Sequence, residues 1–242
     1  MKPVISIIIP TLKEEQYLEK TLQNLASLEI PHEIIITDGG SKDRTLEIAK
    51  KYTDKVVVWD KERRQTFGEA KNAGAALAIG EFFVFIDADV TIPQPEKFFG
   101  EMLIVFNANR HLVAATVPLL PLPDTKYKVD RIFAAPLNYW YILSNNYFYA
   151  GNASGEFQMI RADAFKRVRG YHEHLIAGED NNMFYRLGQI GRTISYSKLA
   201  VFHTFRRIRK LGWPQVYYNW LLNGFHVMFL RRSAFKEWEV IR

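Results

Sequence analysis

Short apolar runs alternate along the first 90 residues with stretches in which apolar side chains recur every three or four positions. The runs predict buried strands at residues 5–9, 34–36, 56–59 and 82–86. The periodic stretches predict helices around residues 18–28, 46–49 and 67–79. Strands that alternate with helices in this way favour an α/β fold with an open, mostly parallel central sheet flanked by helices.

Polar side chains follow three of these strands. Thr11 follows the first strand, Asp38 the second, and Asp87 and Asp89 the fourth. The carboxyl ends of parallel strands meet at one edge of a sheet, where ligands of such folds bind. Two carboxylates one residue apart suit a hard cation such as Mn²⁺ or Mg²⁺, which in turn suits a diphosphate. A plain acidic turn after a strand is the alternative.

A series of motifs follows in order over residues 3–203, at segments 9–15, 36–45, 70–74, 85–89, 157–161, 170–173 and 178–180. In these segments the sequence resembles the inverting nucleotide-sugar glycosyltransferases of family 2, which have the GT-A fold. Two positions depart from the family pattern, because Lys13 stands where Asn is frequent and Lys71 where Arg is frequent. A lysine still meets a phosphate, but without the guanidinium fork.

The resemblance implies a donor site for a UDP- or GDP-sugar. Its residues would be Pro10, Thr11, Glu14, Asp38, Lys71, Asp87, Ala88, Asp89 and Arg206. Thr11, Glu14 and Asp38 would contact the base and the ribose, and Lys71 would lie near the base or the phosphates. Asp87 would bind the ribose or a metal-bound water. Asp89 and His203 would ligate the Mn²⁺ or Mg²⁺ that bridges the diphosphate.

A second carboxylate pair, Glu179 and Asp180, precedes a helical pattern in the second half of the chain. From the residues alone, Asp180 would cap that helix. The resemblance instead implies that Asp180 is the general base, which deprotonates an acceptor hydroxyl while the anomeric centre inverts. Glu179 would orient the acceptor or raise the basicity of Asp180. Trp140, in the uncharged aromatic stretch 132–155, is expected to contact the acceptor.

The length of 242 residues supports one sizeable α/β domain. We expect a catalytic domain over 1–205, with a nucleotide-sugar half (1–110) and an acceptor half (111–205), followed by a basic, aromatic tail (206–242). The absence of cysteine excludes disulfides and thiolate metal sites. The first strand follows the initial Met closely, which predicts a cytoplasmic enzyme without a signal peptide.

The net charge of +6 comes entirely from the end of the chain. Residues 203–242 hold eight Lys or Arg and two Asp or Glu. Residues 213–230 lie between basic flanks and predict a helix with a broad apolar face. This helix is too polar to be predicted as a membrane span. Such a helix suits an anionic membrane surface, and packing on the catalytic domain or in a homodimer is the alternative. Nucleic-acid binding is disfavoured, because the basic residues flank aromatics and form no groove of their own.

The expected activity is therefore inverting transfer of a sugar to an acceptor hydroxyl, in a glycan or a lipid-linked acceptor near the membrane. One alternative is a polyprenyl-phosphate glycosyltransferase, whose phosphate acceptor has less need of a base. Another is a catalytically inactive binding module with the GT-A fold. No Gly-X-Gly-X-X-Gly follows the first strand, which argues against a dinucleotide-binding dehydrogenase.

Overall fold

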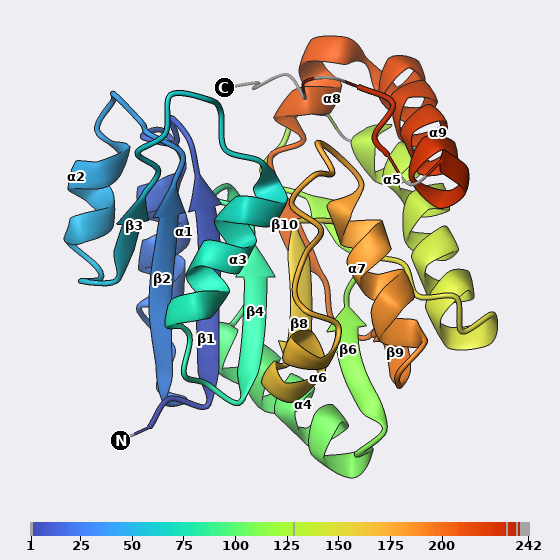
Figure 1. Cartoon of the computed structure of the whole chain (residues 1–242), viewed down its shortest axis with the longest axis horizontal. Coiled ribbons are helices and arrows are strands. Elements are labelled where there is room, and N and C mark those ends of the chain that lie inside the picture. Colours follow the sequence, from blue (N-terminus) through green and yellow to red (C-terminus); the bar gives the residue numbers. More distant parts are fainter. Residues whose placement is uncertain (1, 128, 231, 236, 238–242) are drawn as a thin grey trace.

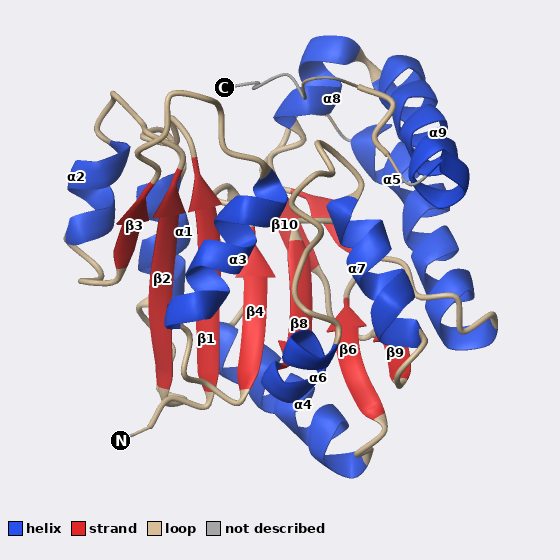
Figure 2. Cartoon of the chain, viewed as in Figure 1, coloured by secondary structure: helices blue, strands red, loops and turns tan. Residues whose placement is uncertain are grey.

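A seven-stranded sheet in the order β3-β2-β1-β4-β8-β6-β9 forms the centre of the molecule (Figures 1 and 2). The computed structural model describes residues 2–127, 129–230, 232–235 and 237. Six strands run in one direction, and β8 runs antiparallel between β4 and β6. The strands are β1 (Ile5–Thr11), β2 (His32–Asp38), β3 (Val56–Val58), β4 (Phe82–Ile86), β6 (Leu112–Thr116), β8 (Phe157–Arg161) and β9 (Arg192–Ser195). The predicted open, mostly parallel sheet is confirmed.

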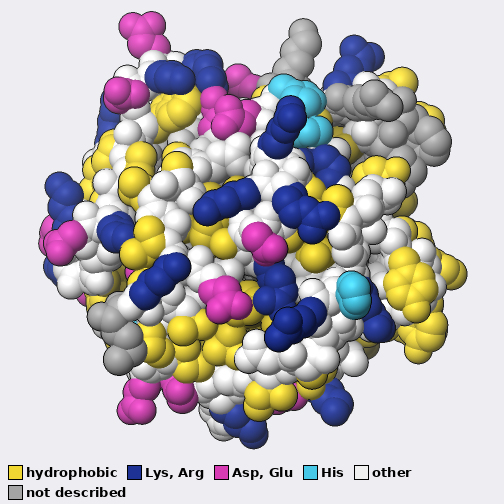
Figure 3. Space-filling model, turned by 60° about the horizontal axis from the view of Figure 1, so that its bottom comes forward, with side chains coloured by type: hydrophobic (Ala, Val, Ile, Leu, Met, Phe, Trp, Pro, Cys, Tyr) yellow, Lys and Arg dark blue, Asp and Glu magenta, His cyan; other side chains and the backbone are white. Residues whose placement is uncertain are grey.

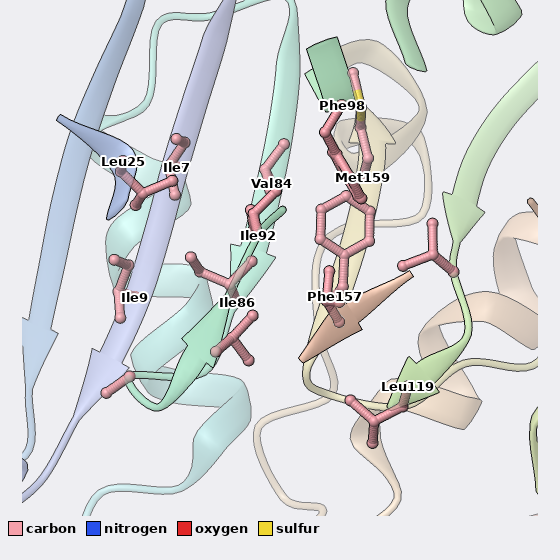
Figure 4. Close-up of a cluster of buried hydrophobic side chains, with 14 of the residues drawn as sticks. Ile7, Ile9, Leu25, Val84, Ile86, Ile92, Phe98, Leu119, Phe157 and Met159 are labelled. Carbon is pink, nitrogen blue, oxygen red and sulfur yellow. The ribbon is translucent and has the colours of Figure 1, made fainter. Parts of the chain in front are cut away.

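Helices cover both faces of this sheet, because side chains alternate between its faces along each strand. Ile7 and Ile9 of β1 pack with α1 and α4 on one face (Figure 4), and Ile8 packs on the other face with the cluster that includes α6 and α7. The helices of the two layers are α1 (Leu18–Leu25), α2 (Thr45–Lys50), α3 (Phe67–Leu77), α4 (Pro95–Ala108), α6 (Ala162–Arg167) and α7 (Glu179–Gly188). The first two strand–helix repeats thus follow the predicted pattern.

A second, three-stranded sheet joins the acidic turn after β4 to the end of the domain. It consists of β5 (Val90–Thr91), β10 (Val201–His203) and β7 (Leu119–Pro121). Val90 pairs with His203 in its antiparallel ladder. The chain leaves the large sheet after Ser195 and enters the small one at Val201. This change of sheet brings His203 to Asp89.

The C-terminal helices α8 (Arg206–Leu211) and α9 (Trp213–Leu230) pack on the domain, where α9 contacts α7 and also α5 (Val129–Ile142), which continues into the π-helical η1 (Leu143–Tyr147). The predicted helix over 213–230 is confirmed. The Trp213 Nε1–H donates to Asp130 Oδ1 at 3.0 Å, and its ring stacks on Phe133 at 5.7 Å. Within the described part of the chain, no helix is long and apolar enough to cross a membrane. Residues 231, 236 and 238–242 of the expected tail lie outside the described residues.

Candidate active site

The first two parallel strands end in two polar side chains, Thr11 and Asp38, that are hydrogen-bonded to each other. The Thr11 hydroxyl donates to Asp38 Oδ2 at 2.9 Å, and Asp38 is fully buried. The backbone N–H groups of Gly40 and Ser41 donate to Asp38 Oδ1, and the Ser41 hydroxyl donates to Oδ2. Asp38 therefore accepts four hydrogen bonds, three of which come from the loop after β2 and fix its shape. Its contact with a nucleotide base stays a prediction.

Asp89 lies between two cations that come from the end of the domain. His203 Nε2 lies 3.2 Å from Asp89 Oδ1, Arg206 Nε lies 3.3 Å from Oδ2, and the Thr204 hydroxyl also donates to Oδ2. Burial raises the pKa of Asp89, but His203 and Arg206 outweigh burial and hold that pKa well below its usual value. Arg206 in turn forms a two-pronged ion pair with buried Glu14, at 2.6 and 2.7 Å. Asp89 and Glu14 thus fix the start of α8 against the donor side of the sheet.

Asp87, Glu156 and His203 form the candidate metal site. A ligand atom of each residue lies within 4.8 Å of the others. Burial raises the pKa of Asp87 to about 6, and the nearby carboxylates of Glu156 and Asp89 contribute. A divalent cation would relieve this repulsion, and two carboxylates with an imidazole suit Mn²⁺. The residues present therefore fit a cation, with Asp87 and Glu156 as oxygen ligands beside the predicted His203.

The expected first ligand, Asp89, is placed differently from this group. Its carboxylate is held by His203 and Arg206, whereas Asp87 points toward Glu156 and His203. His203 Nδ1 accepts the Phe205 N–H at 3.1 Å, which leaves Nε2 as the atom facing the acidic groups. The structure therefore favours Asp87 over Asp89 as a metal ligand, because the Asp89 carboxylate is already engaged by His203 and Arg206. Direct ligation by Asp89 stays a prediction.

Asp180, the expected base, is held at the N-terminus of α7 by a buried lysine. Lys71 Nζ lies 2.5 Å from Asp180 Oδ1 and 3.0 Å from Glu179 Oε1, and only 2% of the Lys71 side chain is exposed. Burial raises the pKa of Asp180 and, with the neighbouring Asp180 charge, raises that of Glu179 to about 7, while Lys71 opposes both shifts. Burial lowers the pKa of Lys71, but the two carboxylates outweigh it and raise that pKa. A carboxylate whose pKa is raised in this way is suited to general base catalysis.

One expectation about this region needs correction. Asp180 is no helix cap, because Gly178 occupies the capping position with a φ of 80° and Asp180 is the second helical residue. Lys71 pairs with the carboxylates of the expected acceptor side, and its charge also lowers the pKa of Asp87. A position of Lys71 near the base or the phosphates stays a prediction.

Trp140, expected at the acceptor, lies at the surface of α5 with 49% of its side chain exposed. The next residue, Tyr141, is buried instead. Burial raises the pKa of Tyr141 most, and the nearby charges of Glu156 and Asp180 raise it further. Successive residues of a helix point about 100° apart, so only one of the two faces the site. Ala88 is buried in the core, and its carbonyl accepts the Thr21 hydroxyl, while Pro10 is half-buried at the end of β1.

Glu156 is the residue that the sequence did not reveal. It stands directly before β8, which runs antiparallel to its neighbours. The amino end of an antiparallel strand lies at the edge where the parallel strands have their carboxyl ends. In the sequence, Glu156 directly precedes the mostly apolar segment 157–160. This position indicates a site residue only once the direction of the strand is known.

The sequence matches the family model described as Glycosyl transferase family 2 over residues 6–169, more than half of the chain. The chain belongs to this family. Its α/β fold, with a mostly parallel sheet flanked by helices, agrees with GT-A structures.

Similar family 2 proteins come from several prokaryotes. A Methanococcus voltae dolichyl N-acetyl-α-D-glucosaminyl phosphate 3-β-D-2,3-diacetamido-2,3-dideoxy-β-D-glucuronosyltransferase is 38% identical over 104 residues, which cover 39% of this chain and 31% of that protein. The succinoglycan biosynthesis protein ExoA of Rhizobium meliloti is 27% identical over 206 residues, 78% of this chain and 59% of ExoA. The chain therefore spans about a third to three fifths of the length of these two relatives.

Solved structures of family 2 and related enzymes share this fold. The mannosyltransferase PcManGT from Pyrobaculum calidifontis, in complex with GDP-Man and Mn²⁺, has a TM-score of 0.65 at 17% identity, and the match covers 91% of this chain and 65% of the PcManGT chain. S. aureus TarS 1-349 in complex with UDP-GlcNAc has a TM-score of 0.64 at 19% identity, and the match covers 95% of this chain and 73% of the TarS chain. At these identities the likeness shows the fold alone.

Proposed function

We propose that this glycosyltransferase inverts the anomeric centre as it transfers a sugar from a nucleoside-diphosphate sugar to an acceptor hydroxyl. The observation that carries the proposal is the arrangement of Asp180. Its carboxylate is buried, its pKa is raised, and it lies against Gly155, the residue next to Glu156 of the candidate metal site. A base is thereby placed beside the group that would hold the donor diphosphate.

The residues on the donor side have a separate task. Asp87, Glu156 and His203 would hold Mn²⁺ or Mg²⁺, which supplies charge neutralisation for the departing diphosphate. Arg206 is fixed by Glu14 and Asp89 beside this site and adds a positive charge. Asp180 takes the proton of the acceptor hydroxyl, because a sugar hydroxyl is a poor nucleophile until that proton leaves.

The test compares two substitutions at equivalent positions of two helices. Asp180→Asn removes the base at the second residue of α7, and Asp163→Asn alters an exposed carboxylate at the second residue of α6. With UDP-GlcNAc, GDP-mannose and other nucleotide sugars in the presence of Mn²⁺, donor-dependent thermal shifts should persist in both variants. Transfer should fall roughly 10²–10⁴-fold only in Asp180→Asn.

Other outcomes of this comparison discriminate between the candidate functions. Transfer by Asp180→Asn within a few-fold of the parent would favour the polyprenyl-phosphate acceptor. A parent protein that shifts with donors but neither transfers nor hydrolyses them would be the inactive binding module.

We further propose that the acceptor is lipid-linked and that the enzyme docks on an anionic membrane surface. Exposed aromatic and aliphatic side chains line α5, η1 and α9, which we call the aromatic surface: Ile132, Tyr139, Trp140, Tyr147, Phe148, Tyr149, Tyr218, Leu221 and Phe225. Hydrophobic side chains gather at the right edge of the space-filling view, the side on which Figure 1 draws α5 (Figure 3). Exposed cations lie beside tyrosines at two places, with Arg209 over Tyr127 and Arg192 over Tyr149.

Co-sedimentation with vesicles that contain anionic lipid tests this docking. Arg206 is excluded from the test, because it belongs to the site through Glu14 and Asp89. Exchanging the exposed Lys126, Arg131 and Arg209 for Gln should weaken binding, and added salt should act in the same direction, since each cation near such a surface contributes about 1 kcal/mol. If the parent protein remains in the supernatant at low salt, the docking proposal is wrong. The acceptor would then be soluble, and the aromatic surface would contact protein.

A further inference from the structure

A fully buried glutamine, Gln158 of β8, contacts the same carboxylate as Lys71. Its Nε2 donates to Asp180 Oδ1 at 2.8 Å and to the Ser154 carbonyl at 3.0 Å. Its Oε1 accepts the hydroxyl of buried Tyr171. Since Oε1 receives a donor and Nε2 meets two acceptors, the amide has one orientation that satisfies all three contacts. Gln158 therefore presents an N–H to the base.

The loop before β8 limits the position of Asp180 from another direction. A Cβ added at Gly155 would lie 2.7 Å from Asp180 Oδ2 and 3.7 Å from Lys71 Nζ. The two donors hold Oδ1, and the bare backbone of Gly155 leaves room for Oδ2. Both oxygens of the carboxylate are thus constrained by residues of one short segment, 155–158, and by Lys71.

We propose that Gln158 is a positioning residue for Asp180, oriented by the Tyr171 hydroxyl and assisted by the clearance at Gly155. This inference rests on the proposed role of Asp180 as the base. Its physical reason is that hydrogen bonds to an ionised carboxylate are strong and directional. With Lys71, the bond from Gln158 occupies Oδ1, leaves Oδ2 to take the acceptor proton, and favours the charged form. Buried polar groups are costly unless bonded, and here three bonds compensate for the buried amide.

Several groups besides Gln158 act on the charge of Asp180. They are Lys71 from α3, Glu179 beside it on α7, Asp87 after β4, Tyr171 from the loop before α7 and Tyr141 from α5. Gln158→Met replaces none of these residues and keeps the side-chain length, but it removes both the N–H that bonds Asp180 and the acceptor of the Tyr171 hydroxyl. Tyr171→Phe removes that hydroxyl alone, so the shift of the pH profile in Gln158→Met beyond that in Tyr171→Phe reports the lost hydrogen bond to Asp180.

Three variants test the proposal against a matched control. Gln158→Met should lower kcat by at least about tenfold with the donor KM within twofold, because Asp180 loses a donor that orients its carboxylate. The acidic limb of the kcat/KM profile should move upward by about one pH unit, because a hydrogen bond to a charged group stabilises it by about one pKa unit or more. Tyr171→Phe should change kcat and the acidic limb in the same direction but by less, because the Gln158 amide remains and only the hydroxyl that orients it is lost. Gly155→Ala should also lower kcat, because the new methyl group displaces Oδ2.

The control is Asn138→Leu, which removes a buried amide bonded to the backbone of Leu119, outside the site. It loses hydrogen bonds of the same kind, so its thermal stability should fall without a selective loss of kcat. Gln158→Met with parent kcat and an unchanged profile, while Asp180→Asn is inactive, would overturn the positioning role alone. An Asp180→Asn enzyme that retains transfer would overturn the base assignment instead.

Discussion

Replacing Lys71 by Met should make the stability of the protein fall steeply between pH 5 and pH 8. The lysine is the cation between Asp180 and Glu179, at 2.5 and 3.0 Å, and the three side chains are only 2%, 15% and 5% exposed. Removing one partner of a buried ion pair costs about 3–5 kcal/mol when the remaining charges stay ionised. At lower pH the carboxylates take up protons instead, and most of this cost disappears.

The sign of the pH dependence follows from Glu179. Its pKa is about 7 in the folded protein, against 4.5 as the ordinary value, so burial favours its protonated form. A group with a raised pKa contributes stability below its unfolded pKa, and that contribution is lost as the pH rises through the folded pKa. This pKa difference corresponds to about 3 kcal/mol in the free energy of unfolding, at 1.36 kcal/mol per pKa unit. Without Lys71 the pKa values of Glu179 and Asp180 rise further, and the loss on going to pH 8 grows.

Urea denaturation at the two pH values measures the effect. The Lys71→Met variant should lose about 1 kcal/mol at pH 5, as an average point substitution does, and about 3–5 kcal/mol at pH 8. Lys55→Met is the control, because Lys55 pairs with Glu33 while 39% exposed, and such a pair contributes about 1 kcal/mol or less. Equal losses by Lys71→Met at both pH values would refute the reasoning, since a packing defect alone has no such dependence.

Three further substitutions probe the rest of the site and the core. Asp89→Asn should lower the free energy of unfolding by about 3–5 kcal/mol in urea, because His203 and Arg206 lose their buried partner; parent-like stability would contradict the ion-pair role. Glu156→Gln should weaken Mn²⁺ binding on the order of tenfold or more in calorimetry, and an unchanged affinity would remove Glu156 from the metal site. Gly74→Ala should lower stability by about 1–3 kcal/mol, because its Cβ would lie 2.4 Å from an Ile8 methyl group; an unaltered melting temperature would show that the core yields there.

The parts of the site that follow parallel strands could be predicted from the sequence. A buried parallel strand reads as a continuous apolar run, and the polar residue that follows it marks the ligand-binding edge. The positions of Thr11, Asp38 and Asp87 follow from this pattern without the family resemblance. Their detailed contacts were not predictable, because the pairing of Asp38 with the loop after β2 depends on the loop's backbone.

The contribution of β8 could not be predicted, because nothing in the apolar run 157–160 specifies the direction of the strand. Antiparallel insertion places Glu156 and Gln158 at the same edge as Asp87. A similar limit applies to Trp140, since an aromatic stretch does not reveal which helical face is buried. The structure resolves both cases through contacts between segments that are far apart in the sequence.

The ion pair between Glu14 and Arg206 has a consequence for synthesis on the ribosome. The two residues are 192 positions apart, and the Thr204 hydroxyl bonds Asp89 across 115 positions. Glu14 and Asp89 therefore leave the exit tunnel long before their partners, and burying an uncompensated carboxylate in the meantime is costly. We expect the nascent donor side to stay hydrated and loosely closed until residue 206 has emerged. An incomplete chain would then bind nucleotide sugar poorly, and Arg206, the last of these charged residues to be translated, would close the donor side.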